Sequence, residues 1–380
     1  MDRFAKTVPM RCSGCAGPSR AHRGAHLYST VQSRRRSAAV LRAREAQSAF
    51  RLLGLQPVRV ASLPQIFSYV LALSAVPRVA WAHVGRAPEP HDLWATWTFA
   101  PTVIVGLLLG SWLYARGVRA LWHSAGAGRG IATWRVACFA GGIATLAIAL
   151  LSPIDGVAAA LFSVHMIQHM LLVVVAAPLL VLGDPGLASI WALRIGARRG
   201  VGAWWQRRRV LPAVWHALRR PLVAFTLHAA ALWLWHLPTL YDAALHNEGI
   251  HVAEHVSFLA TALLFWYPIA DARPRQRSGV GVATLSLFAA GLQCTFLGAL
   301  IAMSRHAWYF GHYATTAAWG LTPLEDQQLA GLVMWIPAGL VYLAALIPTV
   351  LPVLRGEGMR GWGDEGMRNG LGMHGRSEAV

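Results

Sequence analysis

Seven long apolar segments constrain this chain more than any other feature of its sequence. They lie at about 94–115, 131–151, 160–183, 221–240, 250–270, 280–303 and 327–350. An α-helix rises about 1.5 Å per residue, so each segment can cross the roughly 30 Å hydrocarbon core of a bilayer. Only 13% of the residues are charged, about half the fraction found in soluble domains. The sequence therefore predicts an all-α, polytopic integral membrane bundle of about seven transmembrane helices.

Three segments lie outside the predicted membrane domain at 83–350, two before it and one after it. Residues 1–58 are rich in Arg, Ser and Ala without periodicity, and we interpret them as a disordered leader or a misassigned start. Residues 59–82 combine a basic start, an apolar stretch and a small-residue cleavage motif, which is typical of a signal peptide. A retained signal anchor is the alternative. Residues 351–380 form a basic, Gly-rich tail, which we expect to be solvated and cytoplasmic.

Arginine residues alternate between successive connections. Arginine-rich connections lie at 116–130, 184–220, 271–279 and in the tail, whereas 83–93, 152–159, 241–249 and 304–326 are almost free of arginine. Cytoplasmic loops of membrane proteins carry the excess of Lys and Arg. We therefore expect a bacterial inner (plasma) membrane protein with a periplasmic mature N-terminus and a cytoplasmic C-terminus.

The positions of the basic residues exclude two function classes. The net charge of +18 would suggest nucleic-acid binding, but the arginines follow the orientation rule for membrane proteins, so we expect no nucleic-acid partner. A retinal pump needs a lysine inside its last helix, and the only lysine is Lys6. The lipid bilayer is the predicted environment, and the sequence leaves the oligomeric state open.

Most of the histidines fall on the predicted outer side, and two pairs stand out. His165 and His169 open the third predicted helix, and His251 and His255 open the fifth. A spacing of four residues places both rings of a pair on one helix face. His236 ends the fourth segment at the same level. Because imidazole is the commonest metal-binding side chain, these five residues are the predicted metal ligands.

Other side chains could support or complete such a site. Glu254 and Gln168 could orient the imidazole rings by hydrogen bonding, and Asp326 begins the last helix on the same side. Met166 and Cys294 offer sulfur ligands suited to copper. The structural alternative is that these histidines only satisfy backbone carbonyls or bridge helices.

Four stretches carry a resemblance to a known family. They are HMIQHMLLVVVAAPLLVLGDP at 165–185, LWLWHLPTLYDAALHN at 232–247, HVAEHVSFLATALLFWYPI at 251–269 and DQQLAGLVMWIPAG at 326–339. In this order they resemble the multi-spanning CtaG-type cytochrome c oxidase assembly factor family, which is distinct from the single-span copper chaperone of the same name. The resemblance implies a factor for assembly of a heme–copper oxidase, acting through copper supply or insertion, with oxidase subunits as partners.

Four functions remain open at this point. We expect an assembly factor that binds copper at the outer histidine cluster and supplies it to the oxidase. A copper transporter would need ligands across the whole membrane, for which His228, Cys138 and Cys294 are the available residues. A heme-binding redox protein could use His169 and His255, and a purely structural scaffold would use none of them. The sequence contains no nucleophile–base pair, phosphate loop or paired catalytic carboxylates, so we do not expect an enzyme.

Overall fold

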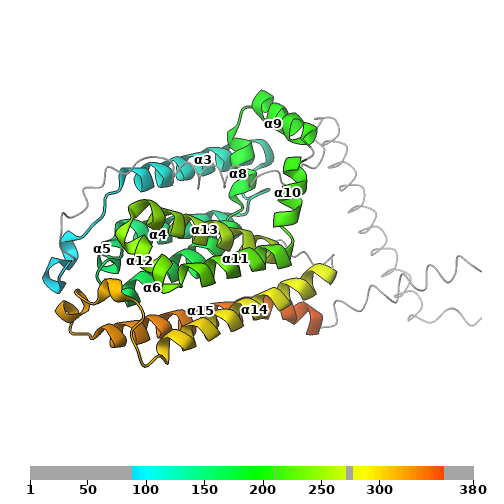
Figure 1. Ribbon diagram of the computed structural model, residues 1–380. Helices are drawn as coiled ribbons and strands as arrows, with labels where there is room; N and C mark the ends of the chain where they lie inside the picture. Colours follow the sequence, from blue (N-terminus) through cyan, green and yellow to red (C-terminus); the bar gives the residue numbers. More distant parts are fainter. Residues whose placement is uncertain (1–87, 209, 271–276, 355–380) are drawn as a thin grey trace, which may run out of the picture. The chain divides into compact units, whose positions relative to one another are not determined.

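The computed structural model describes residues 88–208, 210–270 and 277–354. All regular secondary structure in these residues is helical, which confirms the predicted all-α class (Figure 1). The predicted leader at 1–58, the signal-like segment at 59–82 and most of the predicted tail at 351–380 lie outside the described residues, while residues 351–354 still belong to the last helix and not to a tail. Those three interpretations therefore stay predictions.

Six helices are long and apolar enough to cross a membrane. They are α3 (Pro101–Ala125), α4 (Thr133–Leu151), the continuous run Phe162–Leu182, α13 (Glu248–Ala270), α14 (Arg277–Ala302) and α15 (Pro323–Leu354). A seventh span is obtained if α11 (Pro221–Trp235) and α12 (Pro238–His246), which meet at 75°, are taken as one broken helix. The chain is therefore a polytopic helical membrane protein.

The first span lies further along the chain than predicted. The prediction placed it at 94–115, but a 3-10 turn, η1 (Pro90–Ala95), comes first, and α3 begins at Pro101. Proline suits the first helical position, where its missing N–H costs nothing. The helix then continues to Ala125, because Arg is a good helix former. It ends at Gly126, whose φ of 95° is a conformation that glycine adopts without strain.

The fourth span, predicted as one segment at 221–240, is broken near its end. Proline at 238 disfavours helical geometry in the residue before it, and Leu237 is extended with ψ 126°. His236 and Leu237 therefore form a corner between α11 and α12. This corner moves the ring of His236 into the interior of the bundle, where the side chain is 6% exposed.

The arginine-rich connection at 184–220 is also more structured than the prediction, which treated it as a loop. It contains α8 (Pro185–Ala192), α9 (Ile195–Arg207) and α10 (Val210–Leu218). Asp184 caps α8 by accepting a hydrogen bond from the backbone N–H of Leu187. A Cβ atom at Gly117 on α3 would lie 1.8 Å from the carbonyl oxygen of Ala188, so α3 and α8 pack backbone against backbone.

The third span contains a change of helix type. α6 (Phe162–Met170) passes into a π-helical turn, η2 (Leu171–Ala176), and then into α7 (Ala177–Leu182). Pro178 has no N–H to donate, which removes one α-helical hydrogen bond from this region. Wide π turns inside α-helices are frequent at functional sites.

Successive spans run in opposite directions, which sorts the residues between two ends of the bundle. The N-termini of α6, α13 and α15 meet the C-termini of α4 and α14 at one end, which we call the histidine end. It is covered by α5 (Pro153–Ala158), η3 (Phe310–His312) and η4 (Thr316–Trp319). The opposite end, the arginine end, carries α8, α9 and α10, and all described arginine side chains except Arg305.

Candidate metal centre

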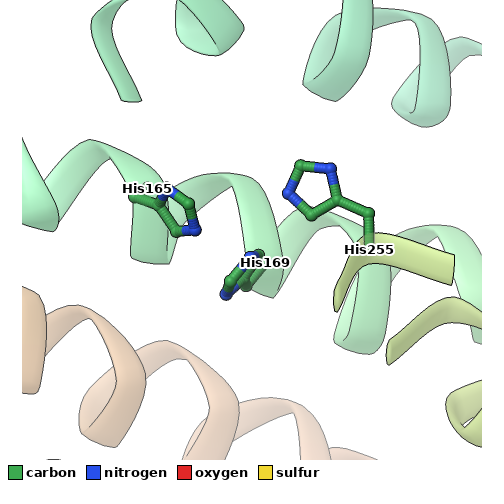
Figure 2. A group of neighbouring side chains, drawn as sticks. All are labelled: His165, His169 and His255. Carbon is green, nitrogen blue, oxygen red and sulfur yellow. The ribbon is translucent and has the colours of Figure 1, made fainter. Parts of the chain in front are cut away.

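The two predicted histidine pairs face each other across the histidine end. His165 and His169 lie on α6 with ring centroids 4.3 Å apart, and His251 and His255 lie on α13 with centroids 4.2 Å apart. Between the helices, the rings of His169 and His255 are 5.2 Å apart. Figure 2 shows His165 and His169 on one helix and His255 on the other. The four rings form one cluster.

The ring nitrogens of this cluster are close enough to share an ion. One nitrogen each from His165, His169 and His255 lie within 4.8 Å of one another. The same limit holds for ligand atoms of His165, His251 and Glu254. Three nitrogens bound at about 2.0 Å to a tetrahedral ion are roughly 3.3 Å apart. Small ring rotations would therefore bring either set to binding distance.

The carboxylate of Glu254 lies between the two pairs. Its oxygens are 3.7 Å from Nε2 of His165 and 3.6 Å from Nε2 of His169, which is too long for a hydrogen bond. Within the described residues, neither Glu254 oxygen, neither ring nitrogen of His169 nor Nε2 of His165 has a hydrogen-bond partner. All three side chains are 1% exposed or less. Burying such groups without partners costs about 1–3 kcal/mol each, and a bound cation would remove that cost.

At least one buried histidine away from the cluster has a hydrogen-bond partner. His228 on α11 is also 1% exposed, but its Nδ1 lies 3.1 Å from the hydroxyl of Thr261. His228 therefore shows that a buried imidazole of this protein can be hydrogen-bonded. Outside the cluster, Nδ1 of the buried His312 also has no hydrogen-bond partner among the described residues.

His236 lies at the corner between α11 and α12 and contacts Met166 instead of the main cluster. Its Nδ1 is 2.7 Å from the carbonyl of Leu232, and its Nε2 is 3.4 Å from the sulfur of Met166. The hydroxyl of Tyr309 donates to the backbone carbonyl of His236 at 2.9 Å. This predicted ligand therefore lies beside a predicted sulfur ligand.

Asp326 holds the backbone of the histidine-bearing helix. Its carboxylate accepts from the N–H of Phe162 at 2.7 Å and from the N–H of Ser163 at 3.0 Å, and also from the Ser163 hydroxyl. These are the first backbone donors of α6, which need partners outside the helix. Asp326 thus fixes the start of the helix that carries His165 and His169.

Two of the predicted residues point elsewhere. The amide of Gln168 donates to the carbonyl of Ala149 and to Asp155, at 2.8 Å and 2.7 Å, so it ties α6 to α4 and α5. Cys294 is buried on α14 and its thiol lies 3.5 Å from the carbonyl of Met334. In the described part of the chain, neither residue belongs to a group of side chains that could hold a metal together.

A covering of aromatic side chains was not predicted. The hydroxyl of Tyr241 is hydrogen-bonded to Nε2 of His312 at 2.7 Å, and the Tyr241 ring packs 5.1 Å from that of His165. Phe162 packs against both Tyr241 and Tyr309. His312 lies in the connection outside the spans, and burial lowers its pKa to about 4. No local pattern signals this contact, because its partners are 71 residues apart.

Comparison with known proteins gives distant relatives. An uncharacterized protein of Mycobacterium bovis is 29% identical over 218 residues, covering 55% of this chain and 32% of the relative. An uncharacterized protein of Mycobacterium leprae is 24% identical over 225 residues, covering 57% and 34%. The chain thus spans about a third of the length of the curated relatives that it matches. No solved structure matches it.

A family profile covers most of the bundle. The profile described as cytochrome c oxidase caa3 assembly factor (Caa3_CtaG) matches residues 112–355. The matched region is more than half of the chain and contains α6 and α13 with all four clustered histidines. The chain belongs to the cytochrome c oxidase caa3 assembly factor family.

Proposed function

We propose that this chain binds copper at the histidine cluster and supplies it to a heme–copper oxidase during assembly. One observation carries the proposal: both carboxylate oxygens of Glu254, both ring nitrogens of His169 and Nε2 of His165 are buried and lack hydrogen-bond partners among the described residues. A divalent cation would be bound by the neutral imidazoles, and the carboxylate would offset one of its two charges. The proposed role is binding and release of the ion, without chemistry on a further substrate.

The choice of copper rests on two arguments. Imidazole and carboxylate ligands alone would also suit zinc or iron. The family, however, serves an oxidase, and a thioether lies beside His236 at 3.4 Å. Heme fits less well, because the rings of His169 and His255 are 5.2 Å apart and perpendicular, and Phe258 packs 4.6 Å from His169. The short distance between the two rings is the argument against a macrocycle between them.

We further propose that the histidine end faces the periplasm of a bacterial plasma membrane and that the arginine end faces the cytoplasm. The proposal rests on the arginine side chains, which gather around α8, α9 and α10. In this orientation the cluster lies near the surface from which an oxidase subunit could accept copper. A transport path is less favoured, because His228 and Cys294 are already engaged with Thr261 and with a backbone carbonyl.

The first experiment measures copper bound to purified full-length protein after loading with cupric ion. We expect nitrogen hyperfine structure in the electron paramagnetic resonance spectrum, and loss of the bound copper in a His165→Ala/His169→Ala/His255→Ala variant. His228→Ala is the matched control, because it removes a buried imidazole away from the cluster. Circular dichroism checks that all proteins are folded. A parent that stays copper-free after loading would overturn the proposal.

A second experiment separates supply from scaffolding. The variants replace the parent gene in its host, and oxidase activity is measured in isolated membranes. Copper supply predicts that the triple variant lowers oxidase activity and that added copper partly restores it, while His228→Ala behaves as the parent. A scaffold predicts normal oxidase activity in a triple variant that is present in normal amount, and this result would contradict copper supply.

A further inference from the structure

We propose that His236 and Met166 form a second subsite that takes cuprous ion, beside the nitrogen and carboxylate cluster. This inference rests on the proposed copper-handling function and adds that cuprous and cupric ions bind at different sites. Its basis is a contact between two buried side chains that cannot be an ordinary hydrogen bond.

The hydrogen bond at Nδ1 decides the protonation of His236. Nδ1 lies 2.7 Å from the carbonyl oxygen of Leu232. A carbonyl oxygen can only accept, so Nδ1 carries the proton in the neutral ring. The helix ends at this point, and the backbone N–H of His236 turns to Leu234, which leaves the Leu232 carbonyl to the side chain. Nε2 is therefore the unprotonated nitrogen and presents a lone pair.

That lone pair faces a second acceptor. Nε2 is 3.4 Å from the sulfur of Met166, and a thioether has no proton to donate. His236 is 6% exposed and Met166 is fully buried. A methionine in a helix bundle is usually a flexible filler of the core. Here, however, its sulfur is directed at the one polar atom of His236 that has no proton, and a cation between the two would satisfy both.

The separation fits a soft ion. With metal–nitrogen and metal–sulfur bonds of about 2.0 Å and 2.3 Å, two ligand atoms 3.4 Å apart subtend roughly 105° at the metal. This value lies close to the angles of trigonal and tetrahedral coordination. Thioether sulfur is a soft ligand, and soft sulfur ligands suit cuprous ion.

The charge of the ligands at each site also matches the ion proposed for it. His236 and Met166 are both neutral ligands, which suits a monovalent ion. The neighbouring cluster adds the carboxylate of Glu254, 3.7 Å from His165, which suits a divalent one. The two sites are neighbours, because Met166 directly follows His165 and the ring of Phe258 packs against both His169 and His236. The proposal assigns binding only and requires no electron transfer.

The test measures cuprous affinity of the full-length protein by anaerobic competition with bicinchoninate. Met166→Leu conserves volume and removes the sulfur. Because even changes to residues around a metal site weaken binding about 10–100-fold, we expect cuprous affinity to fall at least about tenfold while cupric binding at the cluster is unchanged. Met334→Leu is the matched control, since Met334 is equally buried. We expect the control to bind as the parent does.

X-ray absorption of the copper(I)-loaded parent gives a readout that needs no substitution. In selenomethionine protein a copper–selenium distance is expected, and it disappears in the Met166→Leu variant. Unchanged cuprous binding in Met166→Leu, or a cuprous ion without a methionine ligand, would overturn the second subsite. If cupric ion still binds the cluster, only this inference fails. If the parent binds neither ion, the proposed function fails as well.

Discussion

Each end of the bundle uses an aspartate to hold the start of a helix, and the surroundings of the two carboxylates differ. At the arginine end, Asp184 caps α8, which begins at the next residue, and its side chain is 35% exposed beside Arg135. At the histidine end, Asp326 is 1% exposed and caps α6, which lies 164 residues away in sequence. Asp184 thus caps the helix that directly follows it from a partly exposed position, whereas Asp326 is buried and joins distant parts of the chain.

The largest expected effect is a loss of stability on removing the buried aspartate. Asp326→Ala leaves the buried N–H groups of Phe162 and Ser163 without an acceptor, which we expect to lower the free energy of unfolding by about 2–4 kcal/mol. Asp184→Ala removes a half-exposed cap, and we expect a loss of about 1 kcal/mol. Titration with a denaturing detergent measures both. Equal losses of unfolding free energy in the two variants would contradict the difference between the two aspartates.

The second prediction concerns packing at the arginine end. Gly117→Ala places a Cβ atom against the Ala188 carbonyl, where no space is left, and we expect a loss of about 2 kcal/mol. Copper binding at the other end should be retained. Gly110→Ala on the same helix is the control, because a Cβ atom there meets nothing within 4 Å. Loss of copper affinity in Gly117→Ala would mean that the two ends are not separable.

A smaller effect is expected at Glu254, where substitution should not lower the stability of the metal-free protein. Replacing a buried carboxylate that lacks hydrogen bonds by the neutral amide removes a desolvation cost, so Glu254→Gln without metal should be as stable as the parent or more stable by about 1 kcal/mol. The rise in melting temperature on adding cupric ion should be strongly reduced. Glu248→Gln, which changes an exposed residue of the same helix, should keep that rise. Destabilisation of the metal-free Glu254→Gln protein would show that the carboxylate is structural.

The smallest effect is a pH dependence from His312. Burial lowers its pKa to about 4 from the ordinary value of 6.5, so the unfolded chain binds this proton more readily than the folded protein. The stability that neutral His312 provides is present above pH 6.5 and is lost as the pH falls towards about 4. His165 and Asp326 also face this ring. Melting temperatures of parent and His312→Gln should therefore differ less at low pH than at pH 7, and a constant difference would contradict the assignment.

Local patterns predicted the parts of the fold and of the site that depend on neighbouring residues. The spacing of His165 and His169, and of His251 and His255, placed each pair on one helix face, and the structure brings the two pairs together. The corner at His236 is also consistent with the proline two residues later, although the apolar segment was predicted to continue to residue 240.

Contacts between distant segments could not be predicted in this way. The sequence grouped Asp326 with the histidine pairs at one end of the bundle, but its partners at the start of α6 follow only from the three-dimensional packing. Gln168 lies one residue from His169 and was expected to orient a ring, yet it binds Asp155 because its position on α6 faces α4 and α5. A sequence places a side chain on a helix, while the neighbouring helices decide what it contacts.

The π-helical turn at Leu171–Ala176 makes the alignment of α6 dependent on residue count. Removing one residue from this turn, for example Val174, would allow a regular α-helix to run through the whole span. Each residue of an α-helix turns the chain by about 100° and advances it by about 1.5 Å. With α7 held in place, the segment bearing His165 and His169 would rotate by roughly that angle away from α13. The extra residue in the π turn therefore fixes the direction in which His165 and His169 point. A chain that kept every histidine but had one residue fewer here would carry these ligands on a face of α6 that is turned away from α13.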